Sequence, residues 1–137
     1  MGINARLETE RAEPLAEVLD PHNYLAWLLG LLDDESMVCL PFIDPYGDTI
    51  FNGLQLPILL SELERASKRL TESSLDIAKR RYLAGAVSWP DLARGQAQEG
   101  CERLTLQDLR GHCDEVIMLI QSALGRGPHH YVRFVGD

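Results

Sequence analysis

The sequence lacks the features that mark membrane and secreted proteins. No run of about 18 consecutive apolar residues occurs, so we expect no membrane-spanning helix. The N-terminal stretch MGINARLETE contains no hydrophobic core of a secretory signal. The three cysteines, Cys39, Cys101 and Cys113, are widely spaced and include no CxxC pair, which is typical of reduced thiols. These absences predict a cytoplasmic protein.

Positive charge is also scarce. The chain has 13 lysines and arginines against 21 aspartates and glutamates, which gives a formal net charge of -8. Such an acidic surface repels phosphate groups and anionic lipids, so we expect no binding to nucleic acid or to membranes. The charge favours a basic protein partner, although a solvated surface without any partner has the same composition.

Sequence motifs for nucleotides and metals are missing as well. No GxGxxG, no GxxxxGK[ST] and no EF-hand calcium loop occurs in the sequence. The set Cys101, His112 and Cys113 lacks a fourth ligand at a spacing suited to zinc, and nothing marks a base beside a nucleophilic cysteine. We therefore predict neither a cofactor nor a bound metal.

The composition that remains, 45% hydrophobic and 25% charged residues, predicts a single globular domain over residues 1–137. Alternation of apolar and polar residues predicts strands, and apolar residues at helical spacing predict helices. We expect strands over 3–9, 15–19 and 129–135, a helix from Asp20-Pro21 to about 30–32, and further helices over 56–70, 73–86 and 105–124. Trp89-Pro90 is expected to end the helix before it, and residues 91–100 are only weakly helical.

Residues 37–56 hold the strongest turn signal in the sequence. Apolar residues on both faces of 37–43 predict a strand covered on both sides, in which Pro41 marks an edge or a bulge. Asp44-Pro45-Tyr46-Gly47 fits a type I turn, and residues 50–51 then predict a return strand. With this hairpin, the order of elements predicts an α+β fold: a mixed or antiparallel sheet of about four to five strands, with helices mainly on one face.

The turn itself carries the first candidate site. Asp44 and Asp48, with Tyr46 between them, present two carboxylates that would suit a metal ion or an acid/base pair. The alternative is structural: Asp44 accepts backbone N–H groups within the turn and Asp48 is solvated.

The C-terminal strand carries the second. His129 and His130 point to opposite faces of a regular strand, so both cannot bind one metal ion. One histidine could join Asp44 or Asp48 and Cys39 in a site, or it could lie exposed or packed at the end of the sheet. Tyr131 and Arg133 are residue types that often anchor protein partners.

Two weaker signals complete the candidates. Asn52 and Gln55 enter a helix whose first turn offers free N–H groups for an anion, but they could equally cap that helix. Trp27 and Met118 hint at a second helical contact such as a homodimer interface, or at simple burial between layers.

These observations favour a non-catalytic, acidic protein-interaction module that neutralises or regulates a partner protein. In size, charge and order of elements the chain resembles bacterial immunity or antitoxin-type proteins as a class, and no motif carries that likeness. The alternative is a small-molecule or metal-dependent enzyme with its site between the Asp44–Asp48 turn and the C-terminal strand.

Overall fold

The computed structural model describes residues 2–84 and 94–136. Four strands form one sheet in the order β2-β1-β4-β3, and every neighbouring pair is antiparallel. The strands are β1 (Asn4–Thr9), β2 (Pro14–Val18), β3 (Asp48–Phe51) and β4 (His130–Val135). The helices are α1 (Tyr24–Gly30), α2 (Leu56–Arg69), α3 (Glu72–Leu83), α4 (Arg94–Arg103) and α5 (Leu106–Arg126). The expected α+β fold is confirmed.

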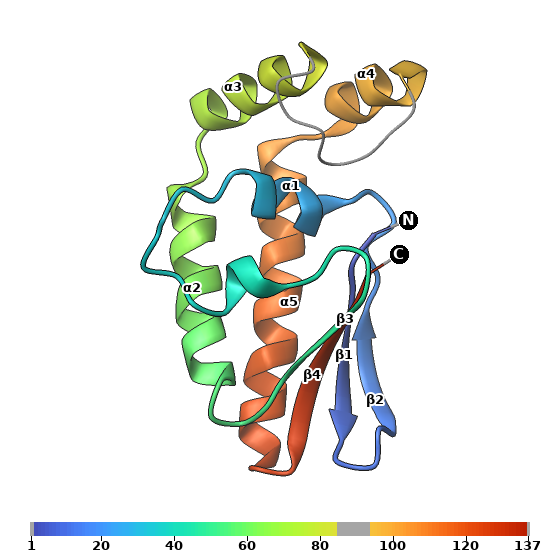
Figure 1. Ribbon diagram of the computed structural model, residues 1–137, viewed down its shortest axis with the longest axis vertical. Coiled ribbons are helices and arrows are strands. Elements are labelled where there is room, and N and C mark those ends of the chain that lie inside the picture. The colour runs from blue at the N-terminus through green and yellow to red at the C-terminus, as the bar shows by residue number, and fades with distance from the viewer. Residues whose placement is uncertain (1, 85–93, 137) are drawn as a thin grey trace.

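The sheet has one covered and one open face, because its central strands alternate as predicted. Ala5 and Leu7 of β1 and Phe134 of β4 are buried against the helices. Arg6 and Arg133 point to the other face, where their side chains remain partly exposed. Figure 1 shows the helical layer on one side of the sheet, with the chain termini close together. The C-terminal strand, expected to join the sheet, lies at its centre between β1 and β3.

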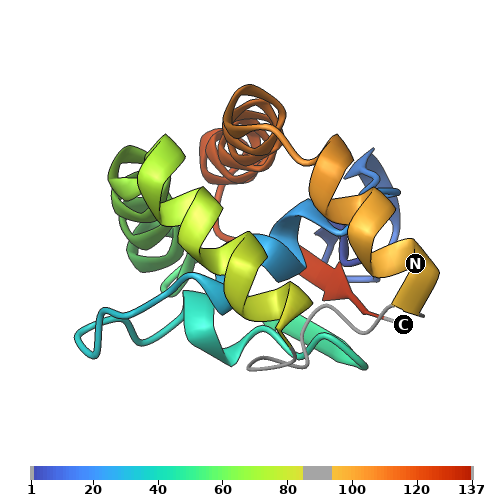
Figure 2. The ribbon, with the colours of Figure 1, turned by 90° about the horizontal axis from the view of Figure 1, so that it is seen from above.

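Helix α5 is the element around which the core assembles. Its N-terminus is capped by Thr105, whose hydroxyl accepts the backbone N–H of Asp108 at 3.1 Å. Its apolar stripe, which includes Leu109, Cys113 and Ile120, is buried. The helix contacts α1, α2 and the strands β1, β2 and β4. Helices α3 and α4 lie beyond the ends of α2 and α5 (Figures 1 and 2).

The prediction of a strand over 37–43 is wrong. This segment is a loop with one turn of 3-10 helix, η1 (Leu40–Phe42), and β3 pairs with β4 instead of with a hairpin partner. The backbone N–H groups of Val38, Cys39 and Leu40 all donate to the side-chain carboxylate of Glu62. Donors held by a carboxylate are no longer available to a neighbouring strand, so the segment does not join the sheet.

Two helix starts also differ from the predictions. Helix α1 begins at Tyr24 rather than at Pro21, because the Asp20 carboxylate reaches past a turn to accept the N–H groups of Tyr24 and Leu25 at 2.8 and 3.1 Å. Helix α3 begins at Glu72, capped by Thr71. The predicted positions Ala86 and Trp89-Pro90 lie outside the described residues.

Within residues 2–84 and 94–136, none of the helices combines the length and apolar character that crossing a membrane requires.

The two residues that hinted at a second helical contact differ in burial. Trp27 is buried in the core, where its ring meets that of Tyr82 edge to face, so the interpretation of simple burial holds for this residue. Met118 is 67% exposed on α5, and the interpretation of simple burial is wrong for this residue.

Candidate functional site

The turn residues of the first candidate site have structural partners. The Asp44 carboxylate accepts the Tyr46 N–H at 2.9 Å, as the sequence predicted for a turn aspartate. The Asp44 backbone N–H donates to the Thr49 hydroxyl at 2.8 Å. Asp48 is not simply solvated, because its carboxylate lies 3.0 Å from an Arg133 guanidinium nitrogen. The two carboxylates therefore support the turn and the sheet.

The structure brings Arg133 to this turn but not His129. In the register of the sheet, Asp48 faces Val135, whereas His130 faces Thr9 at the opposite end of β4. His129 instead lies 3.1 Å from a carboxylate oxygen of Glu10. His130 and Val135, the β4 residues that mark these two ends, are five residues apart, which corresponds to roughly 17 Å of extended strand.

Arg133 is the centre of an ion-pair network on the open face of the sheet. Its guanidinium lies 2.8 Å from the Glu8 carboxylate and 3.0 Å from that of Asp48, so one cation bridges strands β1 and β3. Glu8 is itself buried. These contacts raise the pKa of Arg133 further, chiefly through the hydrogen bond to Glu8. The network stabilises cross-strand pairing and leaves Arg133 a minor candidate for partner contact.

Asn52 and Gln55 bond reciprocally in the turn that leads into α2, and neither side chain accepts an N–H of the helix itself. The Asn52 side chain accepts the N–H groups of Leu54 and Gln55 at 3.0 and 3.1 Å, and the Gln55 side chain accepts the Asn52 N–H at 3.0 Å. This reciprocal bonding resembles a capping box. Asn52 also lines a cavity of about 510 Å³ with Tyr131 of β4, between the start of α2 and the end of α5.

The thiol groups are unsuited to nucleophilic or metal chemistry. All three cysteines are free and buried. Burial raises the pKa of the Cys113 thiol to about 12, and burial likewise raises the pKa values of Cys39 and Cys101. Because the thiolate is the reactive form, these groups are inert at neutral pH. Over residues 2–84 and 94–136, no three histidine, cysteine, aspartate or glutamate side chains converge to hold a metal ion.

His112 is a buried titratable group on α5. Its Nε2 atom has no hydrogen-bond partner and lies 3.9 Å from a carboxylate oxygen of Asp20, while its Nδ1 atom lies 4.0 Å from Glu115. The Tyr24 ring packs against it, with 5.4 Å between the ring centroids. Burial lowers the pKa of His112, and the nearby carboxylates oppose that effect less strongly.

This environment predicts a pH dependence of stability. Above a pH of about 6.5 the His112 imidazole is neutral in both the folded and the unfolded chain, so burying it does not lower the free energy of unfolding. As the pH falls below that value, the unfolded chain binds the proton first and the free energy of unfolding declines. Urea unfolding of the wild type and of His112→Gln at pH 5, 6, 7 and 8 measures this. The stability of the wild type relative to the variant should fall toward pH 5, and a pH-independent difference would contradict the assignment.

Glu62 is a buried carboxylate that accepts three backbone hydrogen bonds. It lies on α2, is almost completely buried, and accepts N–H groups of Val38, Cys39 and Leu40 at 2.7, 2.9 and 2.8 Å. Three charge-assisted hydrogen bonds fix the loop against the helix. The loop is thereby a rigid support for the side chains that it exposes.

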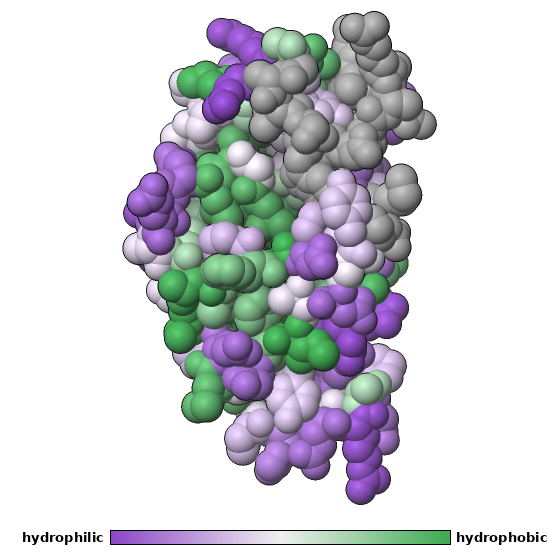
Figure 3. All heavy atoms as spheres, viewed as in Figure 1, coloured by the Kyte–Doolittle hydropathy of each residue, from purple (hydrophilic) through white to green (hydrophobic). Residues whose placement is uncertain are grey.

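Those side chains belong to the apolar surface, which we define as Val38, Phe42, Leu54 and Ile58. They are 58%, 71%, 86% and 45% exposed. Val38 is joined to α2 through Glu62, and Ile58 lies one helical turn before Glu62 on the same side of the helix. Figure 3 shows hydrophobic residues gathered over the face where η1 and α2 lie in Figure 1. Exposed apolar patches of this kind mark interaction sites.

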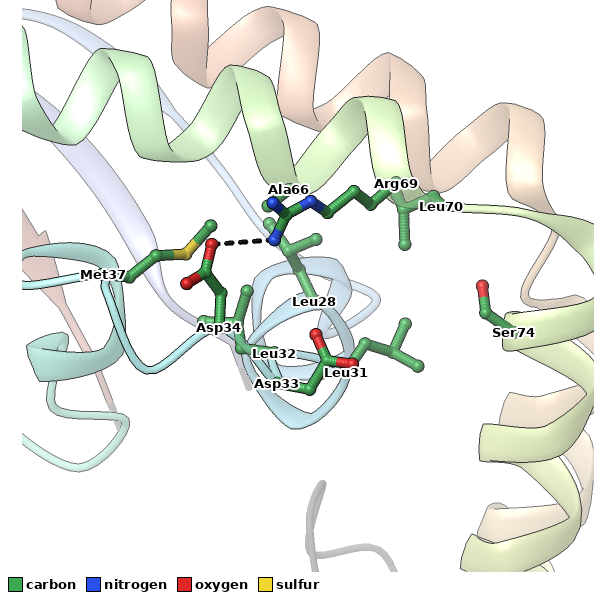
Figure 4. A pocket seen from close by; sticks show the side chains of 10 residues that line it. All are labelled: Leu28, Leu31, Leu32, Asp33, Asp34, Met37, Ala66, Arg69, Leu70 and Ser74. Atoms are coloured by element: carbon green, nitrogen blue, oxygen red, sulfur yellow. Dashed lines mark hydrogen bonds and ion pairs between the residues drawn. The ribbon is translucent and has the colours of Figure 1, made fainter.

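A cavity of about 170 Å³ opens beside this surface, between α1 and α2. Its wall includes Met37 and the ion pair in which Arg69 lies 2.8 Å from the Asp34 carboxylate (Figure 4). Hydrogen bonds from Ser36, followed by Arg69, lower the pKa of Asp34 to about 2. The pair is therefore ionised at neutral pH. Asp33 and Ser74 also line the cavity, and apolar side chains form the rest of its wall.

Glu62 and Arg69 were missed by sequence reasoning, which treated α2 only as an amphipathic helix. Glutamates three or four residues from apolar residues are common on the solvated faces of amphipathic helices. The sequence around Glu62 therefore does not indicate that this side chain is buried. A signal does exist for the cations. Six of the 13 lysines and arginines fall between residues 65 and 81, where Glu72 and Asp76 are the only acids.

Comparisons with known proteins do not assign the chain to a family. No family model, no curated protein and no solved structure matches the chain. The fold therefore defines the class, an α+β protein with a four-stranded antiparallel sheet, and its function must be argued from its own surface.

Proposed function

We propose that this chain is a non-catalytic module that binds another protein through the apolar surface, and that it neutralises or regulates that partner. The observation that carries the proposal is the exposure of Val38, Phe42, Leu54 and Ile58 on a loop and helix fixed to one another by Glu62. A pre-organised loop loses little conformational freedom on binding, which favours affinity. The net charge of -8 adds attraction for a basic partner.

The enzyme hypothesis has less support. Its carboxylates, Asp44 and Asp48, are engaged by the turn and by Arg133, and His129 lies at the other end of β4. An acid/base pair needs a group positioned to exchange a proton with a substrate. The geometry at the turn instead supports structural roles for both aspartates.

Site-specific cross-linking in the native cell tests the proposal. A photoreactive phenylalanine analogue at Phe42 lies in the apolar surface, and the same analogue at Met118, which is 67% exposed on α5, is the matched control. We expect a discrete adduct with a different protein at position 42 and none at position 118. Adducts of equal yield at both positions, or an adduct only with a second copy of this chain, would contradict the proposal.

A further inference from the structure

A second cavity adjoins the one beside Asp34 and Arg69. Its volume is about 280 Å³, and Leu31, Leu32 and Ser74 line both cavities. The two together form the arginine-rimmed groove, which runs between the end of α1 and the helices α2 and α3. Figure 4 shows Leu31, Leu32 and Ser74 around the first cavity. Ile77 and Arg81 of α3 complete the second.

The floor of the groove is apolar and large enough for whole side chains. Leu28, Met37 and Leu70 line the first cavity, and Trp27, Ile77 and Ala78 line the second. A leucine-lined cavity of about 150 Å³ holds a benzene ring, so each cavity has room for at least one aliphatic or aromatic side chain. Ile77, at 52% exposure, borders space that a protein partner could fill.

The segment that spans the end of α2 and most of α3, the two helices bordering the groove, carries a charge opposite to that of the chain as a whole. Residues 65–81 contain six cations and two acids, a net +4, which leaves -12 for the rest of the chain. Among the described residues, Lys68, Arg80 and Arg81 form no ion pair, whereas Arg65 and Arg69 are both paired with Asp34. Lys79 donates to the Leu104 carbonyl, and of the three unpaired cations Arg81 is the one that lines the groove. The unpaired cations therefore concentrate toward α3, and they present positive charge that no acid of the described chain neutralises.

We propose that the arginine-rimmed groove binds an acidic segment of a protein partner, with apolar anchor residues in the two cavities and carboxylates beside Arg81. Asp33 leaves an exposed carboxylate at the mouth of the first cavity, so the acidic end of the segment lies at α3. This inference rests on the proposed function, that the chain binds other proteins, and it specifies the chemistry of a second contact. Discrete cavities on a chain of net charge -8 fit a peptide better than an anionic membrane.

A random 16-residue peptide library displayed on phage supplies the probe. We expect the enriched peptides to contain more aspartate and glutamate than lysine and arginine, together with apolar residues. Their dissociation constants, measured by fluorescence anisotropy, should rise at least about tenfold for Ile77→Ser and for Arg81→Glu. For two matched control variants the dissociation constants should change by less than about twofold. These are Leu83→Ser, equally 52% exposed on α3 but lining neither cavity, and Arg11→Glu in the exposed β1–β2 turn.

Several results would overturn the inference. They are enrichment of basic peptides, no enrichment at all, and equal losses for Ile77→Ser and Leu83→Ser. Binding to vesicles of phosphatidylglycerol and phosphatidylcholine that is abolished by Ile77→Ser would assign the groove to a membrane instead. If the peptide-binding tests of the groove fail while the adduct at position 42 still forms, this inference is refuted and the proposed function is not. Loss of that adduct while acidic peptides still bind refutes the proposed function alone.

Discussion

Replacing Glu62 with alanine is expected to lower the free energy of unfolding by about 3–5 kcal/mol. The substitution leaves the N–H groups of Val38, Cys39 and Leu40 without their acceptor, and the last two are buried. Hydrogen bonds to a charged group contribute about 1.5–3 kcal/mol each, and they do not add fully because the loop relaxes. Urea unfolding followed by circular dichroism measures the change.

Glu62→Gln and Glu64→Gln sharpen this test. In Glu62→Gln the new side-chain amide keeps one acceptor oxygen but turns an NH₂ group toward a backbone donor, so we expect a loss of roughly 2 kcal/mol. Glu64, on the same helix and only half-buried, should change stability by less than about 0.5 kcal/mol when replaced. Hydrogen exchange should show faster exchange at Cys39 and Leu40 in the Glu62 variants. Unchanged protection there, with unchanged stability, would contradict the role of Glu62.

Replacing Phe134 with alanine is expected to cost about 3–5 kcal/mol of unfolding free energy. Phe134 is fully buried on β4, the strand between β1 and β3, and its ring meets that of Phe51 edge to face at 5.7 Å. Truncation removes both transfer free energy and this aromatic contact, and it leaves a cavity at the centre of the sheet. Urea unfolding again reports the change.

Two comparison variants belong with this prediction. Phe134→Leu retains most of the volume and should cost roughly 1 kcal/mol, which keeps the test valid if the alanine variant does not fold. Phe42→Ala removes the same kind of side chain from the apolar surface, where it is largely exposed, and should change stability by less than about 0.5 kcal/mol. Equal costs at positions 42 and 134 would mean that Phe42 belongs to the core rather than to an interface.

The sequence predicts this fold well wherever periodicity and capping act locally. The alternation in residues 3–9 and 129–135 reflects one buried face, and the cap at Thr105 needs only its own helix. The place of β4 at the centre of the sheet was not predicted, because it depends on pairing between chain ends. Periodicity says that a strand forms, and it does not say which neighbours the strand has.

The failure at residues 38–43 has a different cause. The segment is apolar throughout, but its burial does not alternate: Val38 and Phe42 are exposed, whereas the neighbours Cys39 and Leu40 are both buried. A loop fixed on a helix produces the same apolar pattern as a strand in a sheet. What separates the two is the acceptor of the backbone N–H groups, and here that acceptor is Glu62, 22 to 24 residues further along the chain. No local pattern contains this information.

The candidate site was predicted only in part for the same reason. Sequence reasoning grouped Asp44, Tyr46 and Asp48 because they are neighbours, and the structure shows that the turn and Arg133 engage the two aspartates. The apolar surface joins a loop to a helix, and the Asp34–Arg69 pair joins residues 35 apart. The cluster of cations between residues 65 and 81 can be read from the sequence. The cavity that Arg81 lines cannot, and it is this cavity that makes the cluster a candidate binding site.

The central claim, that the apolar surface binds a protein partner, is tested most directly by one dissociation constant. The partner captured at position 42 is purified and titrated calorimetrically against the wild type, the double variant Val38→Ser, Phe42→Ser, and Met118→Ser. We predict that the double variant binds at least about tenfold more weakly, while its unfolding free energy changes by less than about 0.5 kcal/mol and Met118→Ser binds like the wild type. An unchanged dissociation constant for the double variant would contradict the account.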